Sequence, residues 1–120
     1  MRNLSVVSHL VSVRASVGHS QHVGARLGSL IDASIQSSGC LHCAVQRSMT
    51  GENVWSLSGT WSDASAMNDW FCAPELAVFS ELMAQRLVTH LDFQTFEVMT
   101  MTRPGTAERM QGRHAFPRSA

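Results

Sequence analysis

The fold is decided by residues 53–98, which read NVWSLSGTWSDASAMNDWFCAPELAVFSELMAQRLVTHLDFQTFEV. The stretch opens as a strand in which apolar residues alternate, between Trp55 and Trp61. It continues as an apolar helix that is interrupted at Pro74, and it ends in a strand that begins at Val88. A strand, a helix and a strand in this order form one half of a small α+β domain.

The residues before this stretch predict the other half. Residues 5–13 are rich in β-branched side chains, with apolar residues at both parities, as in a strand covered on both faces. Residues 19–38 show helical apolar spacing on one face, and Gly39 suits the left-handed position beyond a helix end. Residues 40–47 and 54–61, joined by turn residues, predict an antiparallel hairpin.

The second helix has a recognisable start and a restart. Ser62 or Asp63 can cap it, and Pro74 suits the first turn of a resumed helix. With a last strand over residues 88–100, the order becomes βαββαβ, the ferredoxin-like fold with a four-stranded antiparallel sheet. Two helices cover one face of such a sheet, and we interpret the other face as rich in large apolar groups. We therefore expect a homodimer, a dimeric α/β barrel, to form through the open sheet face.

Length and charge limit the remaining possibilities. A chain of 120 residues suits one domain, which we place at residues 1–102, followed by a basic tail at residues 103–120. The net charge is zero. Because several arginines lie in the tail, the preceding domain is mildly acidic, and we predict no nucleic-acid partner. All nine basic residues are arginine, which excludes lysine Schiff-base chemistry.

The sequence also predicts a compartment. The apolar run near the N-terminus is interrupted by His9 and Arg14, which argues against a signal peptide. No apolar run approaches the roughly 18 residues of a membrane span, so we expect no membrane partner. Three cysteines are an odd number, which favours reduced thiols and a cytoplasmic protein.

Four segments resemble a known family, the dimeric α/β-barrel proteins named for antibiotic biosynthesis monooxygenases. They are SGC at 38–40, GTWSDASA at 59–66, APE at 73–75 and LDFQTFE at 91–97. The resemblance spans roughly residues 5–98, the length of one such domain. It departs from the family pattern at Gly59, where many members carry glutamate, and at Trp70, where many carry histidine.

The resemblance implies an activity without a cofactor. Such enzymes are cofactor-independent monooxygenases of small aromatic substrates of the anthrone or hydroquinone type, which ionise and then reduce dioxygen directly. The sequence contains no flavin or nicotinamide fingerprint. The alternative is a non-catalytic dimeric protein of the same fold that binds a small ligand or serves as an accessory protein. A haem-degrading relative is disfavoured, because tryptophan at position 70 cannot ligate iron.

Three residues are candidates for catalysis. Trp61 matches the strand-ending aromatic that lines the cavity in oxygenase members of the family, although it is also suited to core packing. His42 and His90 lie on predicted strands and could accept a proton near neutral pH, whereas a structural histidine is the other interpretation. With His9, they could reach one cavity.

Four further residues are candidates for substrate binding: His9, Trp70, Arg86 and Trp55. Trp70 lies on the apolar stripe of its helix, so it suits the core or the mouth of a cavity. Arg86 could bind an anionic substrate or offset a helix dipole.

The motif CLHC at residues 40–43 invites a metal or redox interpretation. On a regular strand, residues three apart point to opposite faces, so we expect the two thiols to diverge. A zinc site also needs a second pair of ligands, so we predict no metal.

Overall fold

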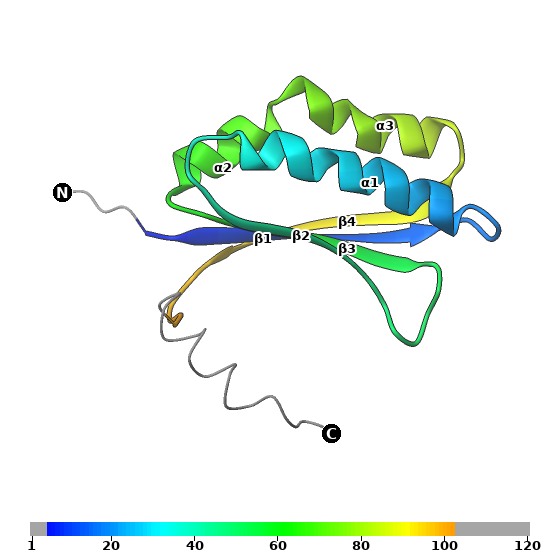
Figure 1. The fold of residues 1–120 in the computed structure, drawn as a ribbon, viewed down its shortest axis with the longest axis horizontal. Coiled ribbons are helices and arrows are strands. Elements are labelled where there is room, and N and C mark those ends of the chain that lie inside the picture. Colours follow the sequence, from blue (N-terminus) through cyan, green and yellow to red (C-terminus); the bar gives the residue numbers. More distant parts are fainter. Residues whose placement is uncertain (1–4, 103–120) are drawn as a thin grey trace.

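The computed structural model describes residues 5–102 (Figure 1). Its elements are β1 (Val7–Ala15), α1 (Ser20–Ile35), β2 (Cys40–Arg47), β3 (Val54–Trp61), α2 (Ala64–Phe71), the 3₁₀-helix η1 (Pro74–Leu76), α3 (Ala77–Ala84) and β4 (Val88–Glu97). The predicted hairpin strands are confirmed at both ends, while β1 covers residues 7–15 rather than 5–13. The predicted tail at 103–120 lies outside the described residues.

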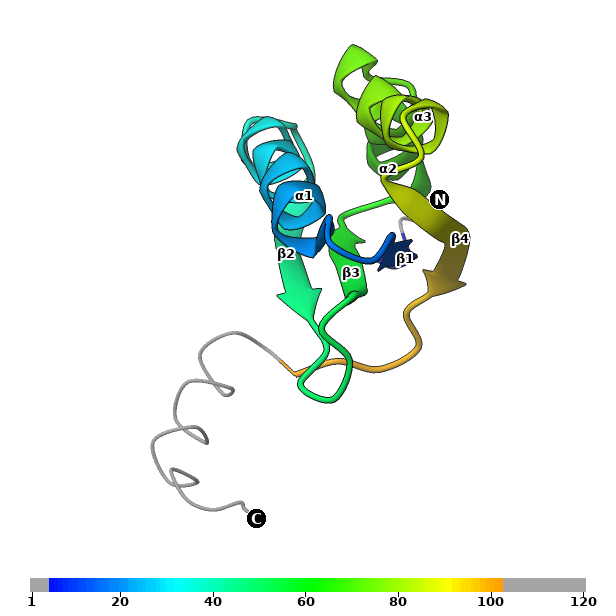
Figure 2. The same cartoon turned by 90° about the vertical axis from the view of Figure 1, so that its right-hand side faces the viewer.

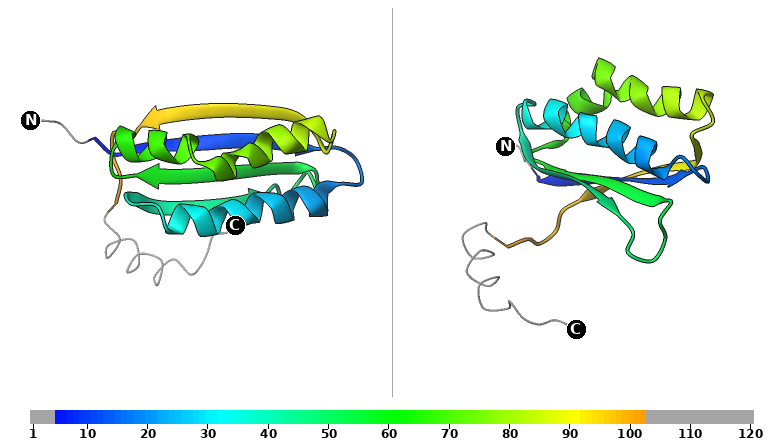
Figure 3. Two further views of the ribbon diagram at one scale, coloured as in Figure 1. Left: turned by 90° about the horizontal axis from the view of Figure 1, so that it is seen from above. Right: turned by 45° about the vertical axis from the view of Figure 1, so that its right-hand side comes forward.

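The four strands form one antiparallel sheet in the order β2-β3-β1-β4. All helices lie on the same face of this sheet, as Figure 1 shows from the side. Seen end-on, α1 covers the β2 side and the α2–α3 pair covers the β4 side (Figure 2). The view from above shows both layers running along the strands (Figure 3). This is the predicted ferredoxin-like α+β fold.

Three local predictions are confirmed. Asp63 caps α2, because its side chain accepts a hydrogen bond from the backbone N–H of Ala66 at 2.9 Å. Pro74 starts η1, which leads directly into α3. Gly39 adopts a left-handed φ of 90° between α1 and β2, the conformation that favours glycine.

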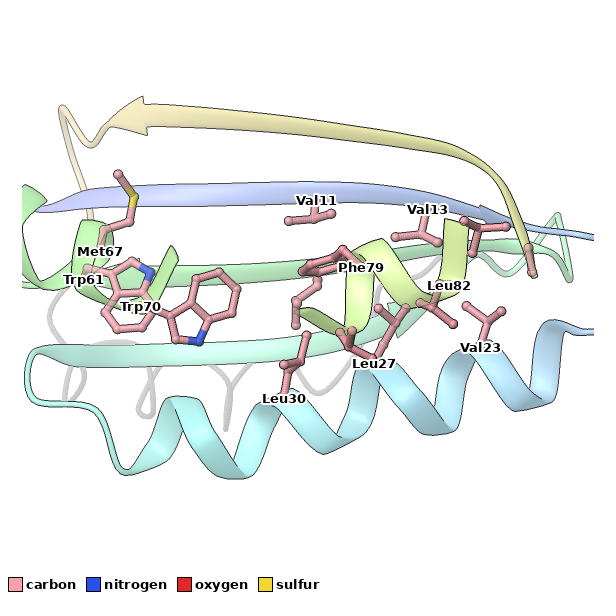
Figure 4. Packing of buried hydrophobic residues seen from close by; sticks show 14 of the residues in the cluster. Val11, Val13, Val23, Leu27, Leu30, Trp61, Met67, Trp70, Phe79 and Leu82 are labelled. Atoms are coloured by element: carbon pink, nitrogen blue, oxygen red, sulfur yellow. The ribbon is translucent and has the colours of Figure 1, made fainter. Parts of the chain in front are cut away.

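The core lies between the sheet and the helices. Figure 4 shows Leu27 and Leu30 of α1 and Leu82 of α3 pointing into this layer, where they belong to the same core cluster as Val11 and Val13 of β1. Trp61 and Trp70 fill the end of this layer. No helix among residues 5–102 is both long and apolar enough to cross a membrane.

The open face of the sheet differs from the prediction. Strand registers place on it a set of mostly small or polar side chains: Ser8, Leu10, Ser12, Arg14, His42, Ala44, Gln46, Val54, Ser56, Ser58, Thr60, His90, Asp92, Gln94 and Phe96. The predicted apolar open face is therefore wrong. The apolar residues of β1 at both parities suggested two apolar faces, but Val7, Val11 and Val13 all face the helices.

The prediction for the two thiols of β2 is also wrong. The pairing with β3 shifts register between Cys40 and His42, which leaves Leu41 as an extra, bulged residue. Cys40 then lies opposite Trp61 and Cys43 opposite Gly59, so both point toward the helices. Within residues 5–102 no cluster of three or more potential metal ligands accompanies them.

Candidate functional site

A buried histidine forms the centre of the candidate site. His9 is on β1 and is only 2% exposed. Alternate residues of a strand point to the same face, so His9 faces the helices together with Val7, Val11 and Val13. Its Nδ1 accepts a hydrogen bond from the indole Nε1–H of Trp61 at 3.0 Å. Trp61, at the end of the adjacent strand β3, is completely buried. The two strands thus hold a polar pair inside an apolar layer.

Gly59 makes room for this pair. It lies directly opposite His9 in the β1–β3 register. A Cβ at position 59 would lie 2.5 Å from Cε1 of His9, closer than a Cβ approaches other atoms in proteins, and a tight 3.1 Å from Nε1 of Trp61. The buried histidine therefore requires glycine as its neighbour.

Aromatic rings surround the histidine on the helix side. Trp70 of α2 stacks on His9, with ring centroids 4.5 Å apart and planes 18° apart. Phe71 approaches both rings edge-on, at 5.5 Å from His9 and 5.1 Å from Trp70. Trp70 lies between Trp61 and Phe79 over the sheet (Figure 4), and its centroid is 5.6 Å from that of Trp61.

The hydrogen bond and the burial together define the state of His9. Because Nδ1 accepts from Trp61, the neutral ring carries its proton on Nε2. Burial lowers the pKa of His9 from 6.5 to about 4. Near neutral pH, His9 is therefore an uncharged hydrogen-bond donor.

Two buried donors have no partner among residues 5–102. These are Nε2 of His9 and Nε1 of Trp70, which belong to the two stacked rings. An unpaired buried donor costs about 1–3 kcal/mol, and most buried polar groups in proteins are hydrogen-bonded. Either donor would be satisfied by an oxygen acceptor.

An apolar hollow borders the cluster. Its volume is about 510 Å³, within the range of small-molecule sites. Side chains from α2, η1, α3 and β4 line it: Phe71, Leu76, Phe79, Ser80, Met83, Leu91 and Phe93. Phe71 belongs to both the hollow and the ring cluster, so the two adjoin at this residue. Ser80 is the hollow's single polar side chain.

Comparison with protein families matches residues 7–82 to the antibiotic biosynthesis monooxygenase model. The chain belongs to this family. Comparison with curated proteins finds no match.

Solved structures share the fold of this family member. A protein from Deinococcus radiodurans, described as a candidate antibiotic biosynthesis monooxygenase, has a TM-score of 0.72 and 23% identity, covering 82% of this chain and 96% of its own. Protein SO0527 from Shewanella oneidensis has a TM-score of 0.74 and 18% identity, covering 80% and 93%. SnoaB, a cofactor-independent oxygenase from Streptomyces nogalater, has a TM-score of 0.63 and 17% identity, covering 81% and 96%.

The three predicted histidines do not meet in this monooxygenase-family chain. His42, on β2, and His90, on β4, are exposed on the open sheet face and lie on opposite edges of the sheet. His9 alone lies between the sheet and the helices. The expectation that the three histidines reach one cavity is wrong for the single chain. It did not take into account which face of the sheet each strand position points to.

Of the predicted binding residues, Trp70 joins His9 while two others lie elsewhere. Trp55 is six residues before Trp61 on β3, roughly 20 Å along the strand, and donates its indole N–H to Ser20 Oγ at 2.9 Å. Arg86, exposed and with a φ of 60°, is in the turn before β4 at that same end. Its carbonyl accepts from Ser16 Oγ at 2.8 Å.

The sequence interpretation did not identify Phe71 and Phe93 as site residues. Their ring centroids are 6.3 Å apart, and Phe93 is 46% exposed. An apolar side chain on a helix-facing strand position that remains half-exposed is a signal of a hollow, but exposure is not visible in the sequence.

Proposed function

We propose that the protein is a cofactor-independent monooxygenase of a small aromatic substrate of the anthrone or hydroquinone type. The observation that carries the proposal is the pair of unpartnered buried donors, His9 Nε2–H and Trp70 Nε1–H, in a ring cluster that meets an apolar hollow at Phe71. Membership of the monooxygenase family supports it, as does the fold shared with SnoaB.

The substrate supplies the electrons in this proposal. An anthrone loses a ring-CH₂ proton to become an enolate, which passes electrons to dioxygen and forms a peroxide. Loss of water from the peroxide leaves a carbonyl, so CH₂ and O₂ become C=O and H₂O. The two N–H donors stabilise the substrate oxygen on which negative charge develops, and the apolar lining excludes water.

His9 acts as a donor rather than as a base in this scheme. Its Nδ1 is occupied by Trp61, and its lowered pKa opposes proton uptake at neutral pH. Trp61 is accordingly a positioning residue that fixes the tautomer of His9. The substrate must then ionise through its own acidity, assisted by the two donors. This role for His9 replaces the catalytic role predicted for His42 and His90, whose exposure on the other face gives that role no support.

One observation favours the second candidate, a non-catalytic small-ligand-binding protein. The space beside Trp61 is filled by side chains, with Trp70 only 1% exposed and His9 stacked on it. Binding in the hollow without access to the donors would give affinity without turnover.

We also propose that the protein is a homodimer that packs through the open sheet face. Apolar side chains remain exposed near one end of that face: Leu41 at 54%, Phe96 at 47%, Met99 at 83% and Met101 at 53%. Leu41, His42, Thr60 and Met101 enclose a hollow of about 570 Å³ there. Light scattering tests this, with a dimer mass expected and a monomer at micromolar concentration contradicting it. A cytoplasmic location is supported by the free cysteines Cys40, Cys43 and Cys72.

Oxygen uptake tests the proposed activity. The purified full-length protein is mixed with a panel of anthrones and hydroquinones, without added cofactor, and dissolved oxygen is recorded. We expect uptake of one O₂ per anthrone, with no oxygen returned on adding catalase, since the second oxygen atom leaves as water. Uptake that equals the protein-free rate for every substrate would reject the oxygenase and favour the binding protein.

A further inference from the structure

We propose that Cys40 and Cys43 form a binding site for one soft, two-coordinate metal ion of the Cu(I) class. Both thiols lie on β2, on the face of the sheet that carries the helices. The site is separate from the proposed oxygenase chemistry, because β2 lies under α1, whereas the apolar hollow is lined from α2, η1, α3 and β4 (Figure 2). The inference therefore goes beyond the proposed function and does not depend on it.

The bulge at Leu41 brings the two thiols to one face. On a regular strand, residues three apart point to opposite faces, but the extra residue turns Cys43 to the side of Cys40. Their partners on β3 are Trp61 and Gly59, which both occupy helix-facing positions. The two cysteines pack against the buried apolar cluster and are themselves half-buried. They therefore form a pair that solvent and small ions can still reach.

The spacing of the pair suits a shared metal ion better than a disulfide. The partners Trp61 and Gly59 are two residues apart, which corresponds to about 6.8 Å along an antiparallel strand. A disulfide needs Cβ atoms about 3.8 Å apart, so parallel side chains at this spacing do not form one without movement of the backbone. Two metal–sulfur bonds of about 2.3 Å each hold sulfurs up to about 4.6 Å apart. Side chains that lean toward each other along the strand reach this separation.

The two thiols influence each other's ionisation. Burial raises the pKa of both, and a charge on Cys40 raises the pKa of Cys43 further. Such an effect falls with distance, so it agrees with two thiols that lie close together. A metal ion between them removes the repulsion of the two thiolates. Each S–H then loses its proton and forms a bond to the metal, with no change in oxidation state.

Each sulfur has a nearby donor that stabilises its thiolate. Ser34 of α1 is completely buried, and its hydroxyl donates to the carbonyl of Leu30 at 2.8 Å. Burial raises the pKa of Cys43, and hydrogen bonding with this Ser34 hydroxyl opposes the increase. Burial likewise raises the pKa of Cys40, and the backbone N–H of His42 opposes that increase. Hydrogen bonds of this kind orient and support the ligands of metal sites.

The number of ligands selects the metal. Thiolates favour soft ions, among them Cu(I) and zinc. A structural zinc ion takes four ligands, but residues 5–102 contain no group of three or more His, Cys, Asp or Glu side chains that could hold a metal. Cu(I) is satisfied by two thiolates. The pair therefore predicts binding of Cu(I) in preference to Zn(II).

Titration with Cu(I) tests the site. The reduced full-length protein is titrated under nitrogen in competition with a Cu(I) chelator of known affinity, and the thiolate-to-copper absorption in the near ultraviolet is recorded. We expect one Cu(I) per chain and the release of about two protons near pH 7. Zn(II) should bind about a hundredfold or more weakly than Cu(I). Equal affinities for the two ions would overturn the two-coordinate site.

Serine variants identify the ligands. Cys40→Ser and Cys43→Ser should each weaken Cu(I) binding about a hundredfold or more, because each loses one of two ligands. Cys72→Ser is the matched control, since Cys72 is exposed and lies at the end of α2. It should bind Cu(I) within about twofold of the wild type. Wild-type affinity in Cys40→Ser or Cys43→Ser, or a large loss in Cys72→Ser, would overturn the assignment.

A measurement on the wild type keeps the test independent of whether the variants fold. Trp61 lies opposite Cys40, whereas Trp55 lies near the other end of β3. Cu(I) should therefore shift the indole N–H signal of Trp61 in the NMR spectrum and leave that of Trp55 in place. Stoichiometric binding of Cu(I) without a shift at Trp61 would show that the ion lies elsewhere, and the proposal would fail.

Discussion

Trp61 donates its indole N–H to Nδ1 of His9 across 3.0 Å, between two neighbouring strands and out of contact with solvent. This bond determines which nitrogen of His9 carries the proton, and therefore what the site can offer a ligand. Gly59 creates the space for the bond, and Trp70 and Phe71 enclose it.

The tautomer of His9 can be observed directly. We expect ¹⁵N NMR of the wild type near pH 7 to show a protonated Nε2 and an unprotonated, hydrogen-bonded Nδ1. Trp61→Phe removes the donor, so the two tautomers become mixed in that variant. A wild-type ring protonated at Nδ1 would contradict the arrangement.

His9 also predicts how stability depends on pH. The pKa is about 6.5 in the unfolded chain and about 4 in the folded protein, so between these values the unfolded chain holds a proton that the folded protein lacks. The free energy of unfolding therefore falls as the pH drops through this window, by at most about 1.4 kcal/mol per pH unit. Above the window His9 is neutral in both states and contributes no slope.

Denaturation with urea at several pH values measures this effect. Between about pH 7 and pH 5, the wild type should lose about 2 kcal/mol more than His9→Leu, because the variant lacks the buried imidazole. Since the comparison uses slopes, a general destabilisation of the variant does not affect it. Parallel slopes would show that His9 is not desolvated in the folded protein.

Gly59→Ala adds only one methyl group, yet it should strongly destabilise the folded protein. The added methyl group would lie within 3.1 Å of atoms of His9 and Trp61, both held in a packed layer, so we expect a loss of about 1–3 kcal/mol. The control is Gly28→Ala in α1, where a Cβ meets no atom within 4 Å. That change should be neutral or stabilising by about 0.5–1 kcal/mol. Thermal unfolding distinguishes the two, and equal melting temperatures would be inconsistent with the close approach at Gly59.

The start of α2 depends on Asp63, because its side chain pairs with the N–H of Ala66 at 2.9 Å. Asp63→Ala should cost about 1 kcal/mol, and Asp63→Asn, which keeps an acceptor, much less. Chemical unfolding provides the measurement. Asp69→Ala, at an exposed position within α2, serves as the control for loss of a carboxylate. If it destabilises as much as Asp63→Ala, the cap is not the cause.

Sequence patterns were sufficient for most of the fold. The alternation between Trp55 and Trp61, the cap at Asp63 and the glycine at position 39 each reflect a local requirement that a few residues express. Which side of β1 faces the core was harder to predict, because apolar residues occur at both odd and even positions of the strand. His9 nevertheless lies at an odd position of the strand, as Val7, Val11 and Val13 do, and this was a usable signal that its side chain is buried.

The site was harder to predict because it depends on register. The bulge at Leu41 has no local signature, yet it turns Cys40 and Cys43 to the same face. The meeting of His9 with Gly59 and Trp61 depends on the pairing of β1 with β3, which are separated by a helix and another strand in the sequence. Register is set by the whole sheet, so single positions such as His42 and His90 could not be assigned to a face.

The central claim is that the stacked His9–Trp70 pair forms the reaction site. The most direct measurement is the rate of cofactor-free oxygen uptake by Trp70→Phe and by Trp55→Phe, which changes a tryptophan at the opposite end of the same sheet. We predict that Trp70→Phe loses at least about tenfold in kcat/KM, as expected when a donor to developing negative charge is removed, while Trp55→Phe stays within about twofold of the wild type. Equal rates in the two variants would contradict the claim.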